Sequence, residues 1–272
     1  MDRDRGAYRT AQLLKAGETA ASIRAAARAG GLDDIGPGWW AVPTADRDVV
    51  AAVRAGGVLS CVSALKLYGL WIAPGYPGLH VRCSRHGEEN GKRRCSPFGR
   101  QPPTRHAVDD LPTALACATK CMSDEDWIAA VDSALNQKLT TLEALQRAWP
   151  RIPRRVLNML GKCDGRAQSG TETIVRLRLR ALGFHVEVQK WIDNVGWVDL
   201  VVGRLVIECD SRGFHTSKEA RTNDARRDRH TQIGNRIVVR IMYDEVLYCW
   251  PEVLADIRAF TDADRHRDRR RR

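Results

Sequence analysis

The sequence predicts an α+β protein in which a largely helical N-terminal part precedes a C-terminal region with the element order αβββαβα. Helical periodicity recurs in several short segments before residue 160, whereas apolar runs of strand length follow residue 184. The length of 272 residues also exceeds the roughly 250 residues at which single hydrophobic cores tend to divide. We therefore expect more than one domain.

The charge balance favours an anionic partner. The chain carries a formal net charge of +11, with 28% charged and 43% hydrophobic residues. Nucleic acid is the polyanion that a basic soluble chain meets most often, although the charge could also serve solubility alone. No apolar run approaches the roughly 20 residues of a membrane span, and the opening MDRDRGAYRT lacks the apolar core of a secretory signal. We predict a cytoplasmic protein that does not bind membrane.

The eight cysteines are scattered along the chain, which favours reduced thiols over a disulfide framework. A zinc site built from Cys83, His86, Cys95 and His106 is an alternative. Its spacing fits no common zinc pattern, and the sequence contains no CxxC pair. We therefore do not expect structural zinc from the sequence.

The first sixty residues predict two short helices followed by turns and a strand. Ala11–Lys15 and Ala20–Arg28 carry helical periodicity, and the breaker Gly17 lies between them. The segment GGLDDIGPGWWAV then supplies turn residues and a short aromatic strand. Helix, turn, helix and a small wing is the order of a winged helix-turn-helix, so we assign residues 1–75 as a winged-helix-like DNA-binding region.

The second of these helices would carry the DNA contacts. Ser22, Arg24 and Arg28 lie along it, where hydroxyl and guanidinium groups can reach phosphates or bases. A plain helical bundle is the alternative for short alanine-rich helices of this kind. At the other end of the chain, residues 262–272 are expected to form a disordered basic tail that adds nonspecific phosphate contacts.

Residues 76–165 are expected to form a mixed strand and helical middle region, without an internal repeat. The elements predicted from the wing onward are a largely helical segment at 46–70, a strand at 79–83, a loop or hairpin at 84–105, and helices from Leu111 to about Leu160.

The segment from residue 169 onward is the most informative one, because each of its elements is bounded by turn residues. In order, we predict a helix from Ser169 to Leu182 closed by Gly183, the strands FHVEVQK, GWVDLVV and LVIECD, a basic helix from Lys218 to Ile233, the strand RIVVRI and a closing helix from Trp250 to Phe260.

A two-residue turn at Gly203-Arg204 sets the register of the two central strands. Counting outward from it brings Asp199 directly opposite Glu208, and alternation puts Asp210 on the same face. Directly opposed like charges destabilise a sheet by roughly 0.2–1 kcal/mol. Three carboxylates with no Lys or Arg between them on these strands therefore predict oxygen ligands for Mg²⁺ or Mn²⁺, with a solvent-facing acidic surface as the alternative.

Two further residues are candidates for the same site. Glu172, in SGTETIVR, lies on the first turn of the preceding helix, where it could join the acids or complete a capping box with Ser169. His215 follows Asp210 by five residues and could move a proton at the strand end. A histidine in such a loop could equally be simply exposed.

The basic helix that begins at Lys218 would face the DNA. Asp224 and Asp228 are four residues apart and share a helix face. Arg227 lies between them, where it could contact a scissile phosphate or pair with its neighbours. We therefore include Lys218 and Arg227 among the candidate DNA-binding residues.

These residues resemble the pattern of a known family. The segment from about 167 to 260 looks like domains related to very-short-patch-repair (Vsr) endonucleases in the PD-(D/E)XK superfamily, which have a restriction-endonuclease-like α/β fold. That pattern has a Glu on the first helix, an Asp, an E-x-D-G with a following His, and D-x-x-R-D. The matching residues here are Glu172, Asp199, Glu208, Asp210, His215 and Asp224 to Asp228. Residues 8 to about 120 are similar to the N-terminal regions of AbiE-type antitoxins, which carry a winged helix.

The sequence departs from the family pattern at two positions. The usual superfamily lysine, two residues after the Glu, is Asp210 here, which leaves His215 or Lys218 as the proton-transfer group. Ser211 stands where the relatives often carry Gly, which makes the turn before His215 less standard.

The resemblance implies hydrolysis of a DNA phosphodiester bond. Asp199, Glu208 and Glu172 would bind Mg²⁺ or Mn²⁺, which polarises a phosphoryl oxygen and lowers the pKa of a bound water. His215 would relay a proton, and Arg227 would stabilise developing charge.

The leading hypothesis is a metal-dependent DNA endonuclease, with a nuclease-like domain at residues 166–261 and an N-terminal DNA-binding module. The alternative is an AbiE-antitoxin-like transcriptional regulator or another DNA-binding protein whose nuclease fold no longer cuts. An RNA-directed nuclease and a structural adaptor are weaker alternatives. DNA is the expected partner, while a homodimer and a toxin or defence-system partner are left open.

Overall fold

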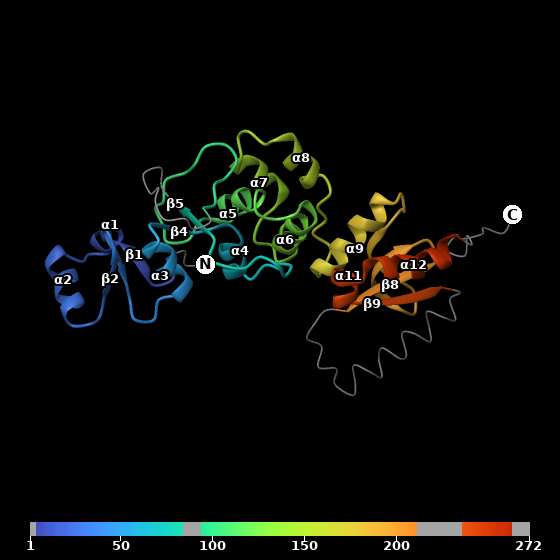
Figure 1. The fold of residues 1–272 in the computed structure, drawn as a ribbon, viewed down its shortest axis with the longest axis horizontal. Coiled ribbons are helices and arrows are strands. Elements are labelled where there is room, and N and C mark those ends of the chain that lie inside the picture. Colours follow the sequence, from blue (N-terminus) through green and yellow to red (C-terminus); the bar gives the residue numbers. More distant parts are fainter. Residues whose placement is uncertain (1–3, 84–93, 211–235, 263–272) are drawn as a thin grey trace, which may run out of the picture. The chain divides into compact units, whose positions relative to one another are not determined.

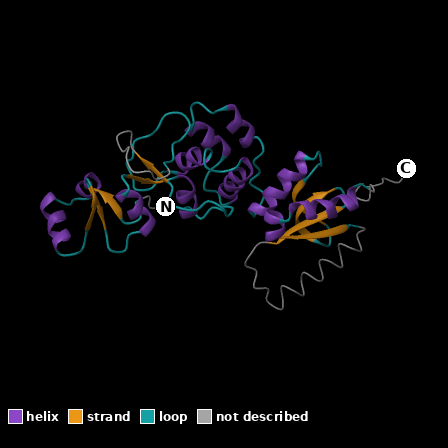
Figure 2. Cartoon of the chain, in the orientation of Figure 1, coloured by secondary structure: helices purple, strands orange, loops and turns teal. Residues whose placement is uncertain are grey.

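The computed structural model describes residues 4–83, 94–210 and 236–262, and these form a mixed α+β protein as the sequence predicts (Figures 1 and 2). The described residues fall into two compact units. Unit 1 comprises the described residues up to Trp127 together with Thr141–Leu160, and unit 2 comprises Ile128–Thr140 together with the described residues from Gly161 onward. The boundaries expected at residues 75, 165 and 261 stay predictions. No helix among the described residues is both long and apolar enough to cross a bilayer.

A three-stranded antiparallel sheet with two helices opens unit 1. The elements in chain order are β1 (Ala7–Arg9), α1 (Thr10–Lys15), α2 (Ala20–Arg28), β2 (Asp33–Gly36) and β3 (Trp39–Ala41). Strand β3 lies between β1 and β2. The Thr19 hydroxyl accepts a hydrogen bond from the backbone N–H of Ser22 at 3.0 Å, which fixes the start of α2. Both helices and β3 confirm the prediction, and β1 and β2 are additional to it.

Two helices occupy most of the segment 46–70, which confirms the prediction of a largely helical segment, and a short strand lies between them. Helices α3 (Arg47–Arg54) and α4 (Cys61–Leu67) flank β4 (Gly57–Leu59), which pairs antiparallel with β5 (Val81–Cys83). Gly57 allows β4 to lie close to β5. A Cβ on Gly57 would lie 2.4 Å from the Cγ1 of Val81, so only glycine lets the two strands approach this closely. Strand β5 confirms the strand predicted at 79–83.

Four helices complete the sequence up to residue 160, as the helical block predicts. They are α5 (Leu111–Ala118), α6 (Asp124–Asn136), α7 (Leu142–Ala148) and α8 (Arg154–Leu160). Trp127 of α6 is fully buried in unit 1, where its indole N–H donates to the carbonyl oxygen of Leu115 at 2.9 Å and its ring lies 6.4 Å from that of Trp149. The ring of Trp127 is thus packed in the core while its N–H has a hydrogen-bond partner, as a buried tryptophan requires.

Unit 2 is built around a four-stranded sheet in the order β6-β7-β8-β9, beside which helices α9, α11 and α12 gather (Figure 1). Its elements from residue 170 onward are α9 (Gly170–Ala181), β6 (Glu187–Ile192), β7 (Gly196–Val202), β8 (Leu205–Asp210), β9 (Ile237–Met242), α11 (Tyr243–Tyr248) and α12 (Trp250–Thr261). Strands β8 and β9 are parallel, and the other pairs are antiparallel. The short helix α11 is additional to the predicted order, and the helix expected at 218–233 lies outside the described residues.

Each unit buries one arginine–aspartate pair. In unit 1, Arg82 Nε donates to Asp109 Oδ2 at 2.6 Å. In unit 2, Arg176 Nη2 of α9 donates to Asp132 Oδ2 of α6 at 2.7 Å, and Thr173 donates to the same oxygen at 2.8 Å. The side chains of Arg176 and Asp132 are 0% and 1% exposed, so each depends on the other for its charge compensation.

Candidate functional site

The β7–β8 turn sets the register that the sequence predicts. Val201 pairs with Val206 and Val202 with Leu205, around the turn that begins at Gly203. Asp199 lies two residues beyond Val201, and Glu208 lies two residues beyond Val206. The printed pairing ends at Leu200 and Ile207, and continued alternation of side chains predicts that the two carboxylates share a sheet face.

Gln189 of β6 joins the acid on the helix to the acid on the sheet. Its side-chain Nε2 donates to Glu172 Oε2 at 3.0 Å and to Asp199 Oδ1 at 3.1 Å. One amide nitrogen bonds both oxygens, so these oxygens are no more than about 6 Å apart. The flanking pairs Val188↔Leu200 and Lys190↔Val198 place Gln189 opposite Asp199. Sequence reasoning missed Gln189, because the register was counted for β7 and β8 but not for β6.

Gln189 also has an unusual backbone conformation for a strand residue. Its φ is +47°, in the left-handed region that residues with a Cβ rarely adopt. Such a conformation persists only where the surrounding structure enforces it, and residues of this kind concentrate at functional sites. Here it accompanies a side chain that bonds two carboxylates.

Glu172 makes only one of the two hydrogen bonds of a capping box. The Ser169 hydroxyl accepts a hydrogen bond from the Glu172 backbone N–H at 3.2 Å, which caps α9. The carboxylate of Glu172 accepts from the backbone N–H of Gln168 at 3.0 Å and from Gln189. The Glu172 carboxylate thus makes one local bond beside the cap of α9 and one bond to Gln189, which also bonds Asp199.

Burial and charge both disfavour the ionised form of Glu172. The residue is only 3% exposed. Burial, and then the negative charge of Asp199, raise the pKa of the Glu172 carboxyl above its ordinary value. A cation shared by the two carboxylates would remove this repulsion.

Asp199 is held at both of its oxygens. Oδ1 accepts from Gln189, and Oδ2 accepts from the backbone N–H of Cys209 in β8 at 2.9 Å. Each carboxylate oxygen has two lone-pair directions, so these two bonds leave room for a cation to bind. Asp199 is therefore positioned by the protein without its ligand capacity being used up.

A buried thiol in β8, Cys209, lies within the electrostatic influence of four acids. Burial, followed by the charges of Asp199, Glu172, Glu208 and Asp210, raises the pKa of Cys209 well above its ordinary value. Glu208 is half-buried, and Asp210 is exposed at the end of β8. The structure thus brings Glu172 and Asp199 together on Gln189, and Glu208 and Asp210 lie on either side of Cys209 along β8. Cys209 itself is a neutral, apolar neighbour of the cluster.

The fourth strand adds a basic residue to this acidic face. On β7 and β8 alone, no Lys or Arg lies between the acids. In the whole sheet, Arg240 of β9 lies beside Glu208 in parallel register. Parallel neighbours in register share a face, so the positive charge of Arg240 partly compensates the negative charge of Glu208.

Several predicted residues cannot be placed at this site. His215, Lys218 and Arg227 lie outside the described residues, as do Asp224 and Asp228. Their roles stay predictions.

The candidate DNA-contacting residues of unit 1 are accessible. Arg24 and Arg28 of α2 are exposed. Ser22 is committed to the cap of α2, because its hydroxyl accepts from the Thr19 backbone N–H at 2.8 Å and donates to Glu18 at 2.6 Å. The two arginines are therefore better candidates than the serine.

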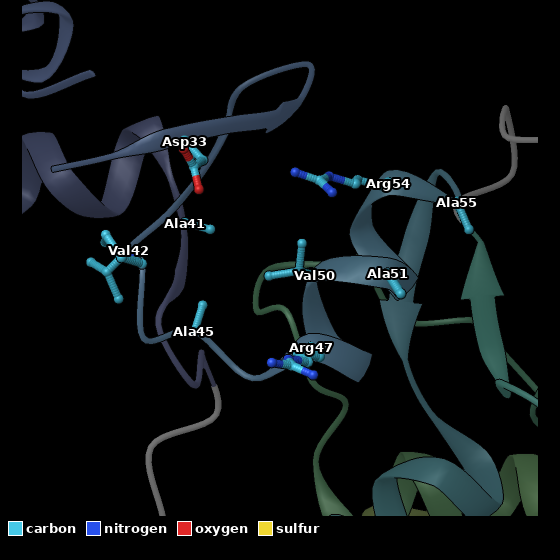
Figure 3. Close-up of a pocket in the computed structure, with 10 residues that line it drawn as sticks. Asp33, Ala41, Val42, Ala45, Arg47, Val50, Ala51, Arg54 and Ala55 are labelled. Carbon is cyan, nitrogen blue, oxygen red and sulfur yellow. The ribbon is translucent and has the colours of Figure 1, made fainter. Parts of the chain in front are cut away.

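A hollow of about 460 Å³ lies between the three-stranded sheet and α3 (Figure 3). Arg47 and Arg54 of α3 lie along its wall, and Asp33 of β2 faces them from the other side. Two exposed arginines at an open hollow can receive an anionic group such as a phosphate. Sequence reasoning did not single out Arg47 or Arg54, because the hollow forms only when α3 packs near the sheet.

Comparison of the sequence with models of protein families gives no match, and comparison with curated proteins gives no significant similarity.

Proposed function

We propose that this protein is a metal-dependent DNA endonuclease that hydrolyses phosphodiester bonds. The observation that carries the proposal is the pairing of Glu172 and Asp199 on the amide of Gln189. A protein has little reason to bury one carboxylate beside another unless a cation joins them, because the arrangement costs free energy without one.

The proposed ligands are of the chemical type that Mg²⁺ or Mn²⁺ prefers. Asp199, Glu208 and Glu172 offer only oxygen atoms, which hard divalent cations prefer. When bound, such an ion polarises a phosphoryl oxygen and lowers the pKa of a water molecule. The chain itself holds Asp199 in place through Gln189 and the Cys209 backbone, and exposed Asp210 marks the side open to substrate.

The remaining roles rest on the resemblance to Vsr-type domains of the PD-(D/E)XK superfamily. We propose that His215 moves a proton and that Lys218 and Arg227 contact DNA near the scissile phosphate. The element order of unit 2, a helix followed by three antiparallel strands and then a strand parallel to the third, supports a restriction-endonuclease-like topology.

Unit 1 would supply DNA affinity. Its strand-helix-helix-strand-strand order supports the winged-helix proposal, and its exposed arginines Arg24 and Arg28 would contact phosphates. Each phosphate neutralised contributes about −0.9 to the slope of log affinity against log salt concentration. Substitution of both arginines by alanine should therefore weaken binding and reduce the slope by up to about two. An unchanged slope would remove α2 from the DNA interface.

The test of the activity is incubation of full-length protein with supercoiled plasmid and with single-stranded DNA in Mg²⁺, Mn²⁺ or chelator. We expect nicking or linearisation only with a divalent cation. DNA binding without cleavage in all metals would contradict the enzyme and favour the second candidate.

That second candidate is a DNA-binding regulator, similar to AbiE-type antitoxins, with a nuclease fold that does not cut. Arg240 beside Glu208 supports it, because a fixed positive charge can compensate an acid that no longer binds metal. Such a regulator would bind DNA equally well in Mg²⁺ and in chelator, apart from the effect of ionic strength.

A further inference from the structure

Four side chains with metal-binding atoms converge in unit 1, far from the carboxylates in sequence. They are Cys61 at the start of α4, His80 just before β5, Cys95, and Cys121 after α5. One ligand atom from each lies within 4.8 Å of every other. Cys61, His80 and Cys95 are buried, at 0%, 1% and 4% exposed, and Cys121 is half-buried.

The separations fit the edges of a metal tetrahedron. The Cys95 and Cys121 sulfurs are 3.9 Å apart, and the Cys95 sulfur lies 3.4 Å from His80 Nδ1. Zn–S bonds of about 2.3 Å and Zn–N bonds of about 2.0–2.1 Å give tetrahedral edges of roughly 3.8 Å and 3.5 Å. A disulfide would instead require the sulfurs to be about 2.05 Å apart. The distances therefore match coordination rather than oxidation.

The cluster is poorly satisfied by hydrogen bonds alone. His80 Nδ1 has only a sulfur neighbour, and His80 Nε2 is buried without a hydrogen-bond partner among the described residues. Thiols are weak donors and weak acceptors, so they compensate a buried imidazole badly. A coordinate bond at Nδ1, the ring nitrogen that faces the Cys95 sulfur, would replace this weak contact with a strong one.

The backbone around the cluster is pinned by bonds from neighbouring elements. The backbone N–H of Cys95 donates to the Val81 carbonyl oxygen at 2.9 Å, and that of His80 donates to the Ser63 hydroxyl at 2.9 Å. Lys120, beside Cys121, donates to the hydroxyl of Ser96 at 3.0 Å. Contacts from outside the cluster thus hold the backbone of Cys95 and His80, and the residue that precedes Cys121 is tied to the residue that follows Cys95.

Charge also favours an occupied site. Three thiolates and a neutral imidazole around Zn²⁺ carry a net charge of about −1. Lys120 is exposed next to Cys121, and its ammonium group lies beside the residue that follows Cys95. This ammonium group offsets the excess negative charge of a Cys₃His site.

We propose that Cys61, His80, Cys95 and Cys121 bind one Zn²⁺ ion as a closed structural site of unit 1. Four protein ligands fill the tetrahedron, so no position is left for substrate, which separates this site from a catalytic one. The ion joins α4, the start of β5 and the end of α5, which are separate elements of the chain. Its binding free energy would therefore become folding free energy of unit 1.

The test is the metal content of full-length protein purified under reducing conditions without chelator, measured by inductively coupled plasma mass spectrometry. We expect one zinc per chain in the wild type and its loss in Cys121→Ala. Cys117→Ala is the matched control, because Cys117 is a buried cysteine of the neighbouring helix outside the cluster, and we expect it to keep the zinc. Zinc retained in Cys121→Ala, or lost equally in Cys117→Ala, would overturn the proposal.

A spectroscopic measurement keeps the proposal testable if Cys121→Ala fails to fold. Full-length wild-type protein is stripped of metal and titrated with Co²⁺. We expect one equivalent to give the visible bands of tetrahedral Co²⁺ together with sulfur-to-cobalt charge-transfer absorption, and Zn²⁺ to abolish both. Octahedral Co²⁺ spectra without charge transfer would overturn the site, as would iron with iron–sulfur absorption in the purified protein.

Discussion

The two clusters of potential metal ligands differ in donor chemistry, exposure and what positions them. The cluster of unit 1 offers three sulfurs and an imidazole, is almost closed to solvent, and brings together distant parts of the sequence. The cluster of unit 2 offers only carboxylates, is held by Gln189 and a strand backbone, and ends at exposed Asp210. Soft donors in a closed site are suited to a metal that stabilises a fold, and hard donors at an open edge to one that meets a substrate.

Unit 2 contains a second contrast, between acids that have a permanent cationic partner and acids that do not. Asp132 has Arg176 as its ion-pair partner at 2.7 Å. Glu172 instead has another acid, Asp199, as the charged group that shifts its pKa. The first arrangement contributes to the fold as it stands, whereas the second would gain charge compensation from the cation that we propose.

We expect the largest loss of stability for Asp132→Ala, because this variant leaves the Arg176 guanidinium buried without its counterion. Removing one member of a buried pair costs about 3–5 kcal/mol in the free energy of unfolding. Urea denaturation of the full-length variant, followed by tryptophan fluorescence, measures this loss. The double variant Asp132→Ala/Arg176→Met should recover part of it. A loss below about 1 kcal/mol in the single variant would show that the pair is not a structural requirement.

Asp199→Asn should have the opposite profile, with activity lost and stability kept. Removing a metal-ligand charge should lower the rate of metal-dependent cleavage by roughly 100- to 1000-fold, equivalent to about 3–4 kcal/mol. Metal-free stability should change little, because the relieved repulsion of Glu172 is offset by the loss of one of the two hydrogen bonds that the Asp199 oxygens accept. Plasmid nicking rates and metal-free melting temperatures measure the two effects.

Asp193→Asn is the matched control for this change, because Asp193 is an exposed acid in the turn between β6 and β7. It should leave the nicking rate unchanged. If both variants lose activity alike, the net charge of the sheet matters rather than the cluster. A melting temperature that falls markedly for metal-free Asp199→Asn would make Asp199 a structural residue.

The register of β7 and β8 could be predicted from sequence because its geometry is local. A two-residue turn fixes the register of β7 and β8, and Asp199 and Glu208 follow from counting along two adjacent strands. Gln189 and Arg240 could not be found this way. The first requires the register of β6, whose turn is longer, and the second requires a parallel strand that arrives after an intervening segment.

The thiol cluster could not be predicted from sequence, because its ligands come from separate elements. The sequence offered Cys83, His86, Cys95 and His106 as an alternative zinc site, and among the described residues of that set only Cys95 belongs to the cluster. His106 Nδ1 lies 3.1 Å from Asp4 Oδ2 instead, Cys83 is outside the cluster, and His86 lies outside the described residues. The packing of α4, β5 and α5 that unites the ligands depends on side-chain contacts throughout unit 1. Spacing along the chain carries no trace of it.

Gln189→Ala should weaken metal binding by an intermediate amount. Residues that orient metal ligands typically contribute 10- to 100-fold in affinity, and Gln189 orients both Glu172 and Asp199. Isothermal titration of metal-free protein with Mn²⁺ measures the change. Gln146→Ala is the control, because Gln146 is an exposed glutamine of α7 in unit 1. Equal affinities for wild type and Gln189→Ala would mean that the cation binds elsewhere.

The smallest expected effect is the pH dependence of metal-free stability, which should respond to Glu172→Gln. The pKa of Glu172 is raised in the folded protein by burial and by Asp199, so the folded state holds a proton that the unfolded state releases above about pH 4.3. Stability from this group is therefore fully present below the unfolded pKa and is lost as pH rises towards the folded pKa. A tenfold difference in the acid dissociation constant between the two states corresponds to about 1.4 kcal/mol.

Glutamine has the size of glutamate but does not titrate, so melting temperatures of metal-free Glu172→Gln should fall less over this pH window than those of wild type. Mn²⁺ binds the deprotonated acid, and its stabilisation of wild type should therefore grow with pH over the same window and be largely lost in the variant. Identical pH profiles for the two proteins would show that the proximity of Glu172 to Asp199 has no energetic consequence. The carboxylates of unit 2 would then lie close together without forming a metal site. Of the two clusters, only the thiol cluster of unit 1 would remain a candidate metal site.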